Sequence, residues 1–121
     1  MKTFIACALL ALTAPSLAAD ASPIEKAIAD PARTAADRER DARDKPAEVL
    51  AFAGVKPGMV VADIFSAGGY YTELLAGVVG ANGKVLAVNN VPYATFARDA
   101  IKARFTEGRL PNAERRLVEA S

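Results

Sequence analysis

The sequence predicts an α/β fold built around a small parallel sheet. Residues 59–64 and 84–89 are short apolar runs, rich in β-branched side chains and bounded by turn signals, which is typical of buried strands in a parallel sheet. Between them lie two adjacent glycines, followed by residues 70–79, whose apolar side chains repeat at helical spacing. A strand, a glycine loop, a helix and a second strand in this order are expected to form one right-handed crossover.

The chain before the first strand is expected to form three short helices. Residues 22–25 (SPIE) predict a helix start, because Ser caps the first turn, Pro takes its first position and Glu its third. Pro31 ends this helix, a second begins near Thr34, and Pro46 opens a third. Residues 37–45 carry eight charges in nine positions. We interpret them as a solvated helix face; the alternative is that one arginine faces a ligand.

Two further elements are predicted after the second strand. Val91 and Pro92 start a helix that has Phe96 on its inner side and closes at Gly108. Residues 115–119 are a candidate for the beginning of a third strand.

Composition and charge narrow the classes of function. With 15 Lys and Arg against 14 Asp and Glu, the net charge of +1 provides no basic field for a polyanion, so nucleic acid is not expected as a partner. A single Cys excludes a disulfide scaffold, and the absence of His removes the commonest general base and metal ligand. Any chemistry must rest on Asp, Glu, Lys, Arg, Tyr, Ser or a bound cofactor.

Residues 1–18 are interpreted as a secretory signal peptide. Lys2 precedes an uncharged run, and Ser16 and Ala18 stand at the positions that favour a cut after Ala18. The run is short and interrupted by Pro15, so it is poorly suited to span a bilayer. The alternative is a buried N-terminal helix. After cleavage we expect an exported chain, periplasmic or secreted, with no stable membrane anchor and a length that suits one small domain.

The loop after the first strand is the candidate binding site. Ligands of open α/β sheets lie beyond the carboxyl ends of the strands, where a helix N-terminus presents unpaired N–H groups. Asp63 closes the first strand here, and Gly68 and Gly69 allow a ligand to approach the backbone. Asn89 follows about twenty residues later, the separation expected of a ribose-binding position. The alternative is an ordinary tight turn. The G-x-G-x-x-G pattern is absent, so an NAD-type oxidoreductase ranks third.

Two adjacent tyrosines, Tyr70 and Tyr71, begin the helix after the loop. One is expected to pack into the core and the other to lean over the loop, while a phenol that acts as general base is the alternative. No nucleophile with an adjacent base is apparent in the sequence, so no catalytic residue is assigned.

The stretch from Asp44 to Asn89 resembles the N-terminal half of class I S-adenosylmethionine-dependent methyltransferases. It looks closest to a group of exported bacterial proteins described as predicted methyltransferases. The resemblance rests on the KPGM turn of residues 56–59, Asp63 at the strand end, the glycine loop that runs into GYYTELLA, and the NGKV turn before the second strand. Arg33 and the DRERD segment are similar to the N-terminal region of that group.

The resemblance implies a Rossmann-like three-layer α/β/α methyltransferase fold. Residues 19–45 would be a charged helical segment, and residues 46–121 the N-terminal half of a domain that binds S-adenosylmethionine. The cofactor-binding residues that it implies are Asp63, Phe65, Ala67, Gly68, Gly69, Tyr70 and Asn89. The usual G-x-G-x-G pattern is met at its final glycine, while Phe65 and Ala67 occupy its first two glycine positions.

Two functions are expected from the sequence. The first is methyl transfer from S-adenosylmethionine to an unknown acceptor. The alternative is a non-enzymatic exported binding module that keeps the same fold. The implied fold needs more strands than the two or three predicted, so we expect an incomplete or truncated product of a protein roughly twice as long.

Overall fold

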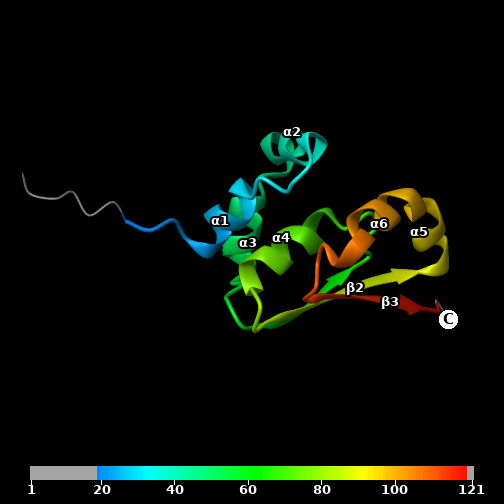
Figure 1. The fold of residues 1–121 in the computed structure, drawn as a ribbon. Helices are drawn as coiled ribbons and strands as arrows, with labels where there is room; N and C mark the ends of the chain where they lie inside the picture. Colours follow the sequence, from blue (N-terminus) through cyan, green and yellow to red (C-terminus); the bar gives the residue numbers. More distant parts are fainter. Residues whose placement is uncertain (1–18, 120–121) are drawn as a thin grey trace, which may run out of the picture.

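A computed structural model describes residues 19–119. The predicted signal peptide lies outside the described residues. The elements, in chain order, are α1 (Pro23–Ala29), α2 (Ala35–Asp44), α3 (Pro46–Ala53), β1 (Val60–Ile64), α4 (Tyr70–Val79), β2 (Lys84–Asn90), α5 (Val91–Phe96), α6 (Arg98–Arg104), the 3₁₀ helix η1 (Thr106–Gly108) and β3 (Ala113–Val118) (Figure 1). Within this part of the chain, no helix has both the length and the apolar character needed to cross a membrane.

The three strands form a parallel sheet in the order β1-β2-β3. Val61 of β1 lies opposite Val85 of β2, which in turn lies opposite Ala113 of β3. Helix α4 connects the first two strands, and helices α5 and α6 connect the second to the third. The predicted α/β fold with a parallel sheet is therefore confirmed, and the third strand is present.

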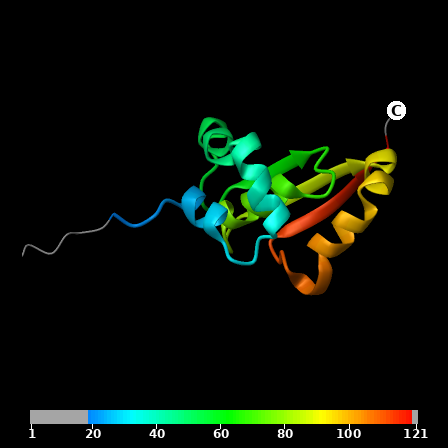
Figure 2. The same cartoon turned by 90° about the horizontal axis from the view of Figure 1, so that it is seen from above.

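Helices α4, α5 and α6 lie on one side of the sheet, above β2 and β3 in Figure 1. Viewed from above, α2 lies on this side as well (Figure 2). The core forms between this helical layer and the sheet, where Leu74 and Val78 of α4, Val85 of β2 and Leu50 of α3 are buried. The described part of the chain thus consists of one layer of helices packed against one sheet.

The other face of the sheet is apolar and open in residues 19–119. Val60 and Ile64 of β1 are 69% and 60% exposed on it, and Leu86 and Val88 stand beside Ala62 and Ile64 in the register. Parallel sheets usually carry helices on both faces. The three-layer arrangement that the resemblance implies would need a second set of helices here.

The helices before the sheet begin where the sequence predicts. Ser22 Oγ accepts a hydrogen bond from the Glu25 backbone N–H at 3.2 Å, and the Glu25 carboxylate accepts one from the Ser22 N–H at 2.7 Å. This reciprocal cap satisfies two N–H groups of α1 that have no partner within the helix. Thr34 Oγ1 caps α2 by accepting from the Asp37 N–H at 3.1 Å.

The single helix predicted after the second strand is in fact two. Ala97 separates α5 from α6 with φ −92° and ψ 11°, outside the regular helical angles. The buried residues of this segment are Ala97 and Ile101, which lie four residues apart. Phe96, expected on the inner side, is exposed, so that expectation was wrong.

Helices α1 and α4 pack closely at Gly77, which generates the first prediction. A Cβ atom there would lie 2.9 Å from Ala27 Cβ and 3.3 Å from Ala27 Cα. Gly77→Val should lower the free energy of unfolding by about 1–3 kcal/mol, because the larger side chain forces the helices apart. Urea unfolding measures it. The control Ala51→Val, at an exposed position of α3, should change stability by less than about 1 kcal/mol; equal losses in both variants would contradict the prediction.

Candidate functional site

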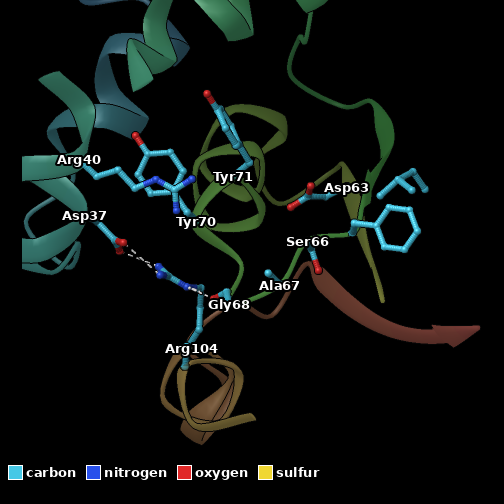
Figure 3. Close-up of a pocket in the computed structure, with 12 residues that line it drawn as sticks. Asp37, Arg40, Asp63, Ser66, Ala67, Gly68, Tyr70, Tyr71 and Arg104 are labelled. Carbon is cyan, nitrogen blue, oxygen red and sulfur yellow. Dashed lines mark hydrogen bonds and ion pairs between the residues drawn. The ribbon is translucent and has the colours of Figure 1, made fainter. Parts of the chain in front are cut away.

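A cavity of about 440 Å³ lies at the carboxyl end of β1, beside the predicted binding loop (Figure 3). Its volume is within the range of roughly 300–1,000 Å³ that is typical of small-molecule sites. Walls come from the loop and the start of α4, and also from α2 and α6. The polar side chains that line it are those of Asp37, Arg40, Asp63, Ser66, Tyr70, Tyr71 and Arg104.

Three alternate residues of the loop, which align with the glycines of the G-x-G-x-G pattern, have positive φ angles. Phe65, Ala67 and Gly69 have φ angles of +56°, +45° and +81°. The left-handed region disfavours a residue with a Cβ by about 1–2 kcal/mol. Three alternate positions therefore adopt the conformation for which glycine is best suited, and Phe65 and Ala67 are held there by their surroundings.

Gly68 is needed for space rather than for its backbone angles. A Cβ atom at this position would lie 2.8 Å from the Cβ of Ala100, so the loop touches helix α6 directly. Phe65 also lines the cavity, is about half exposed, and packs against the ring of Tyr93 with a centroid distance of 5.1 Å.

Asn89 fixes the shape of the loop from behind. Its Oδ1 accepts a hydrogen bond from the Ala67 N–H at 2.9 Å, and its Nδ2 donates to Ser66 Oγ at 3.0 Å. The side chain is buried and lines a smaller cavity of about 270 Å³ between β2, β3 and the two helices that join them. The loop thus engages the polar atoms that were expected to meet a ribose, and a ribose-binding role for Asn89 stays a prediction.

Asp63 points into the larger cavity from the end of β1. One carboxylate oxygen accepts a hydrogen bond of 2.6 Å from Thr72 Oγ1, and Thr72 is fully buried. Burial raises the pKa of Asp63 above its ordinary value, although the Thr72 hydrogen bond acts in the opposite direction. Asp63 forms no ion pair with any residue from 19 to 119. A cation bound in the cavity would therefore give the Asp63 carboxylate the ion-pair partner that it does not have among the described residues.

The side chain of Arg104 joins the loop to two helices. Its Nε donates to the carbonyl oxygen of Gly68 at 2.7 Å, and its Nη1 and Nη2 donate to the carboxylate of Asp37 in α2 at 2.8 and 3.2 Å. Nη1 also contacts the carboxylate of Glu73 in α4, to which Arg109 donates at 2.6 Å. We call Arg104, Asp37, Glu73 and Arg109 the ion cluster. Because a largely buried charge is tolerated only when it is paired, the cluster requires α2, α4 and α6 to assemble together.

The charge of Asp37 is held by this cluster. Burial alone would raise its pKa, but the hydrogen bonds and the positive charge of Arg104 outweigh burial, and the pKa lies below its ordinary value. The carboxylate thus remains ionised at neutral pH.

A second buried pair attaches α2 to the first turn of α4. Arg33 Nη1 and Nη2 donate to the two oxygens of Asp41, each at 2.7 Å, and the Tyr70 hydroxyl donates to Asp41 Oδ1 at 2.6 Å. The Arg33 hydrogen bonds hold the pKa of Asp41 below its ordinary value. Burial and the neighbouring carboxylate raise the pKa of Tyr70, so its phenol stays protonated, which disfavours a role as general base.

Residues 37–45 are thus only in part the solvated face that the sequence suggested. Asp37 is buried, and Arg40 lines the cavity with its guanidinium 4.1 Å from the centroid of the Tyr70 ring. Tyr71 packs edge-to-face against Tyr70 at a centroid distance of 5.0 Å and also faces the cavity. Tyr70 is the tyrosine that packs into the core, as expected, whereas the hydroxyl of Tyr71 donates to the carbonyl oxygen of Asp44 at the end of α2 at 3.4 Å instead of leaning over the loop.

Arg104, Arg109 and Glu73 were not predicted as site residues from the sequence. Glu73 offered one signal, because it is a single acid between Tyr70 and Leu74 in a helix that otherwise has no charged residue. A charge in such a position needs a partner, but the sequence does not indicate which of its basic residues supplies it.

Comparison with known proteins identifies no family for this chain. No family model matches it, and no curated protein matches it at a significant level.

The strained loop generates the second prediction. Ala67→Gly should raise the free energy of unfolding by up to about 1 kcal/mol, because glycine adopts a positive φ without the steric penalty and this gain exceeds its extra entropy in the unfolded chain. The control Ala51→Gly, in helix α3, should lose about 1 kcal/mol. Denaturant unfolding compares the two. A similar loss at both positions would show that Ala67 is not strained.

The Arg33–Asp41 pair generates a prediction on pH dependence. Because the folded-state pKa of Asp41 is lowered, its stabilising contribution is present above the unfolded-state pKa of about 3.9 and is lost as the pH falls through the lower folded value. Asp41→Asn should therefore be less stable than the parent at pH 7 and lose less stability between pH 5 and pH 3. Thermal melts at several pH values measure this.

Asp99→Asn is the control for this experiment, because the side chain of Asp99 is 97% exposed. Its curve of stability against pH should run parallel to that of the parent. If Asp41→Asn also runs parallel, Asp41 does not contribute to the acid dependence in this way.

Proposed function

We propose that the described residues form the cofactor-binding part of an exported class I S-adenosylmethionine-dependent methyltransferase. In this proposal the complete protein has the three-layer Rossmann-like fold, and the cavity beside β1 binds the methionine end of the cofactor. The observation that carries the proposal is Asp63, a largely buried carboxylate that lines the cavity without a cationic partner among residues 19–119. S-adenosylmethionine has two cationic groups, the sulfonium and the ammonium.

Other features of the site support a cofactor of this type. The loop has a positive φ angle, which favours glycine, at each of the three residues that align with the glycines of the G-x-G-x-G pattern. Aromatic rings of Tyr70 and Tyr71 line the cavity, and such rings attract cations. The walls also contain guanidinium groups, which could meet a carboxylate.

The chemistry in this proposal divides between the cofactor and the chain. When bound, S-adenosylmethionine supplies an activated methyl group on its sulfonium sulfur. Asp63 holds positive charge at the strand end, and Tyr70 and Tyr71 form one wall that keeps water away from it. Arg104 and Asn89 hold the loop from two sides, so the chain contributes binding and orientation. The acceptor of the methyl group is not assigned.

The test is a calorimetric titration of the full chain with S-adenosylmethionine, repeated with Asp63→Asn. The substitution keeps an oxygen that can accept from Thr72 but removes the charge, so we expect binding to weaken about tenfold or more. Asp99→Asn, which alters an exposed carboxylate, should bind like the parent. An absence of heat with the folded parent, as judged by circular dichroism, overturns the proposal and favours a non-enzymatic binding module.

A further inference from the structure

Arg40 reaches the cavity from an element outside the strand, loop and helix that form the rest of the predicted site. It belongs to α2, yet its side chain lines the cavity, 43% exposed, with the guanidinium over the face of Tyr70. Its Nε is paired with Asp44, whereas its Nη1 and Nη2 form no hydrogen bond with residues 19–119. The terminal N–H groups of Arg40 are therefore available to a ligand.

The position of Arg40 is supported from both sides. Asp37, three residues earlier, is bound by Arg104, and Asp41, one residue later, is bound by Arg33 and Tyr70. These buried contacts hold the segment of α2 that carries Arg40 against α4 and α6. Stacking on an aromatic face further restricts a guanidinium.

Arg40 and Asp63 give the cavity two opposite charges. Both line it, and Figure 3 shows them on its two sides with Tyr70 and Tyr71 between them. Asp63 has no cationic partner among the described residues, and Arg40 retains free donors toward the same space. An α-amino acid group has the complementary pair of charges, an ammonium and a carboxylate on one carbon atom.

We propose that Arg40 binds the carboxylate of the α-amino acid group at this end of the ligand, opposite Asp63, beside which the ammonium would lie. The inference rests on the proposed function and extends it, because it makes the N-terminal charged segment part of the binding site. A guanidinium binds a carboxylate through two parallel hydrogen bonds, which adds selectivity as well as affinity. The site thereby discriminates against ligands that retain the sulfonium and the amine but lack the carboxylate.

The experiment compares S-adenosylmethionine with its decarboxylated form, which differs only by the missing carboxylate. Both are titrated into the full chain, into Arg40→Gln and into Arg43→Gln. Arg43 is the matched control, because it also pairs with Asp44 but its side chain is 76% exposed. The parent and Arg43→Gln should prefer S-adenosylmethionine by about tenfold or more, and Arg40→Gln should lose this preference while binding the decarboxylated form as before.

The outcomes separate this inference from the proposed function. Equal affinity of the parent for both ligands overturns the inference and leaves the proposed function standing, whereas binding of neither ligand overturns both. If the two arginine variants lose the preference to the same extent, the effect belongs to Asp44 or to the charge of α2, and the inference is wrong. Thermal melts of each variant verify that α2 remains folded against the domain.

Discussion

The guanidinium of Arg104 is the group on which the rest of the site depends. It binds Asp37 of α2, Glu73 of α4 and the carbonyl oxygen of Gly68 in the loop. The side chains of Arg104, Asp37 and Glu73 are all largely buried. Removal of Arg104 would leave Asp37 as a largely buried charge without an ion-pair partner, which is strongly unfavourable, while Glu73 would keep Arg109. The cluster therefore makes the docking of the N-terminal helices, the position of α6 and the shape of the loop parts of one cooperative arrangement.

This arrangement explains how the loop can contain strained residues. Phe65 and Ala67 have positive φ angles that their side chains disfavour, and such residues persist only where surrounding contacts determine the backbone. Arg104 holds the loop at Gly68, and Asn89 holds it at Ser66 and Ala67. The positive φ angles of the loop are thus maintained by hydrogen bonds from two other elements rather than by glycine alone.

In the described residues, one face of the sheet is not covered by helices. Apolar side chains of β1 and β2 lie on this face beside charged side chains of β3. One of these, Glu114, forms an ion pair with Lys84 of β2. A parallel sheet with one layer of helices is enough to place the loop, the cavity and Asp63 at the carboxyl end of β1. The second layer of the proposed three-layer fold has no part in that placement.

Much of the fold follows from local patterns. The strands β1 and β2, the helix α4 between them and the caps at Ser22 and Thr34 were predicted, because apolar periodicity and capping depend on residues a few positions apart. The break at Ala97 was missed, since nothing in the neighbouring residues marks it. The position of the loop at the end of β1 was also predicted, because the topology of a parallel crossover determines it.

The sequence by itself thus determined the strand, loop and helix unit and the place of Asp63 within it. Only the tertiary structure decided which polar groups meet: Arg104 forms ion pairs with Asp37 at a separation of 67 residues and with Glu73 at 31, and the Tyr70 hydroxyl donates a hydrogen bond to Asp41 at 29. Many basic and acidic residues of this chain could pair equally well by composition. Which of them pair depends on how the helices pack, because two charged groups attract strongly only when they lie close together in space. The local pattern of the sequence does not determine the distance between groups that are far apart in the chain.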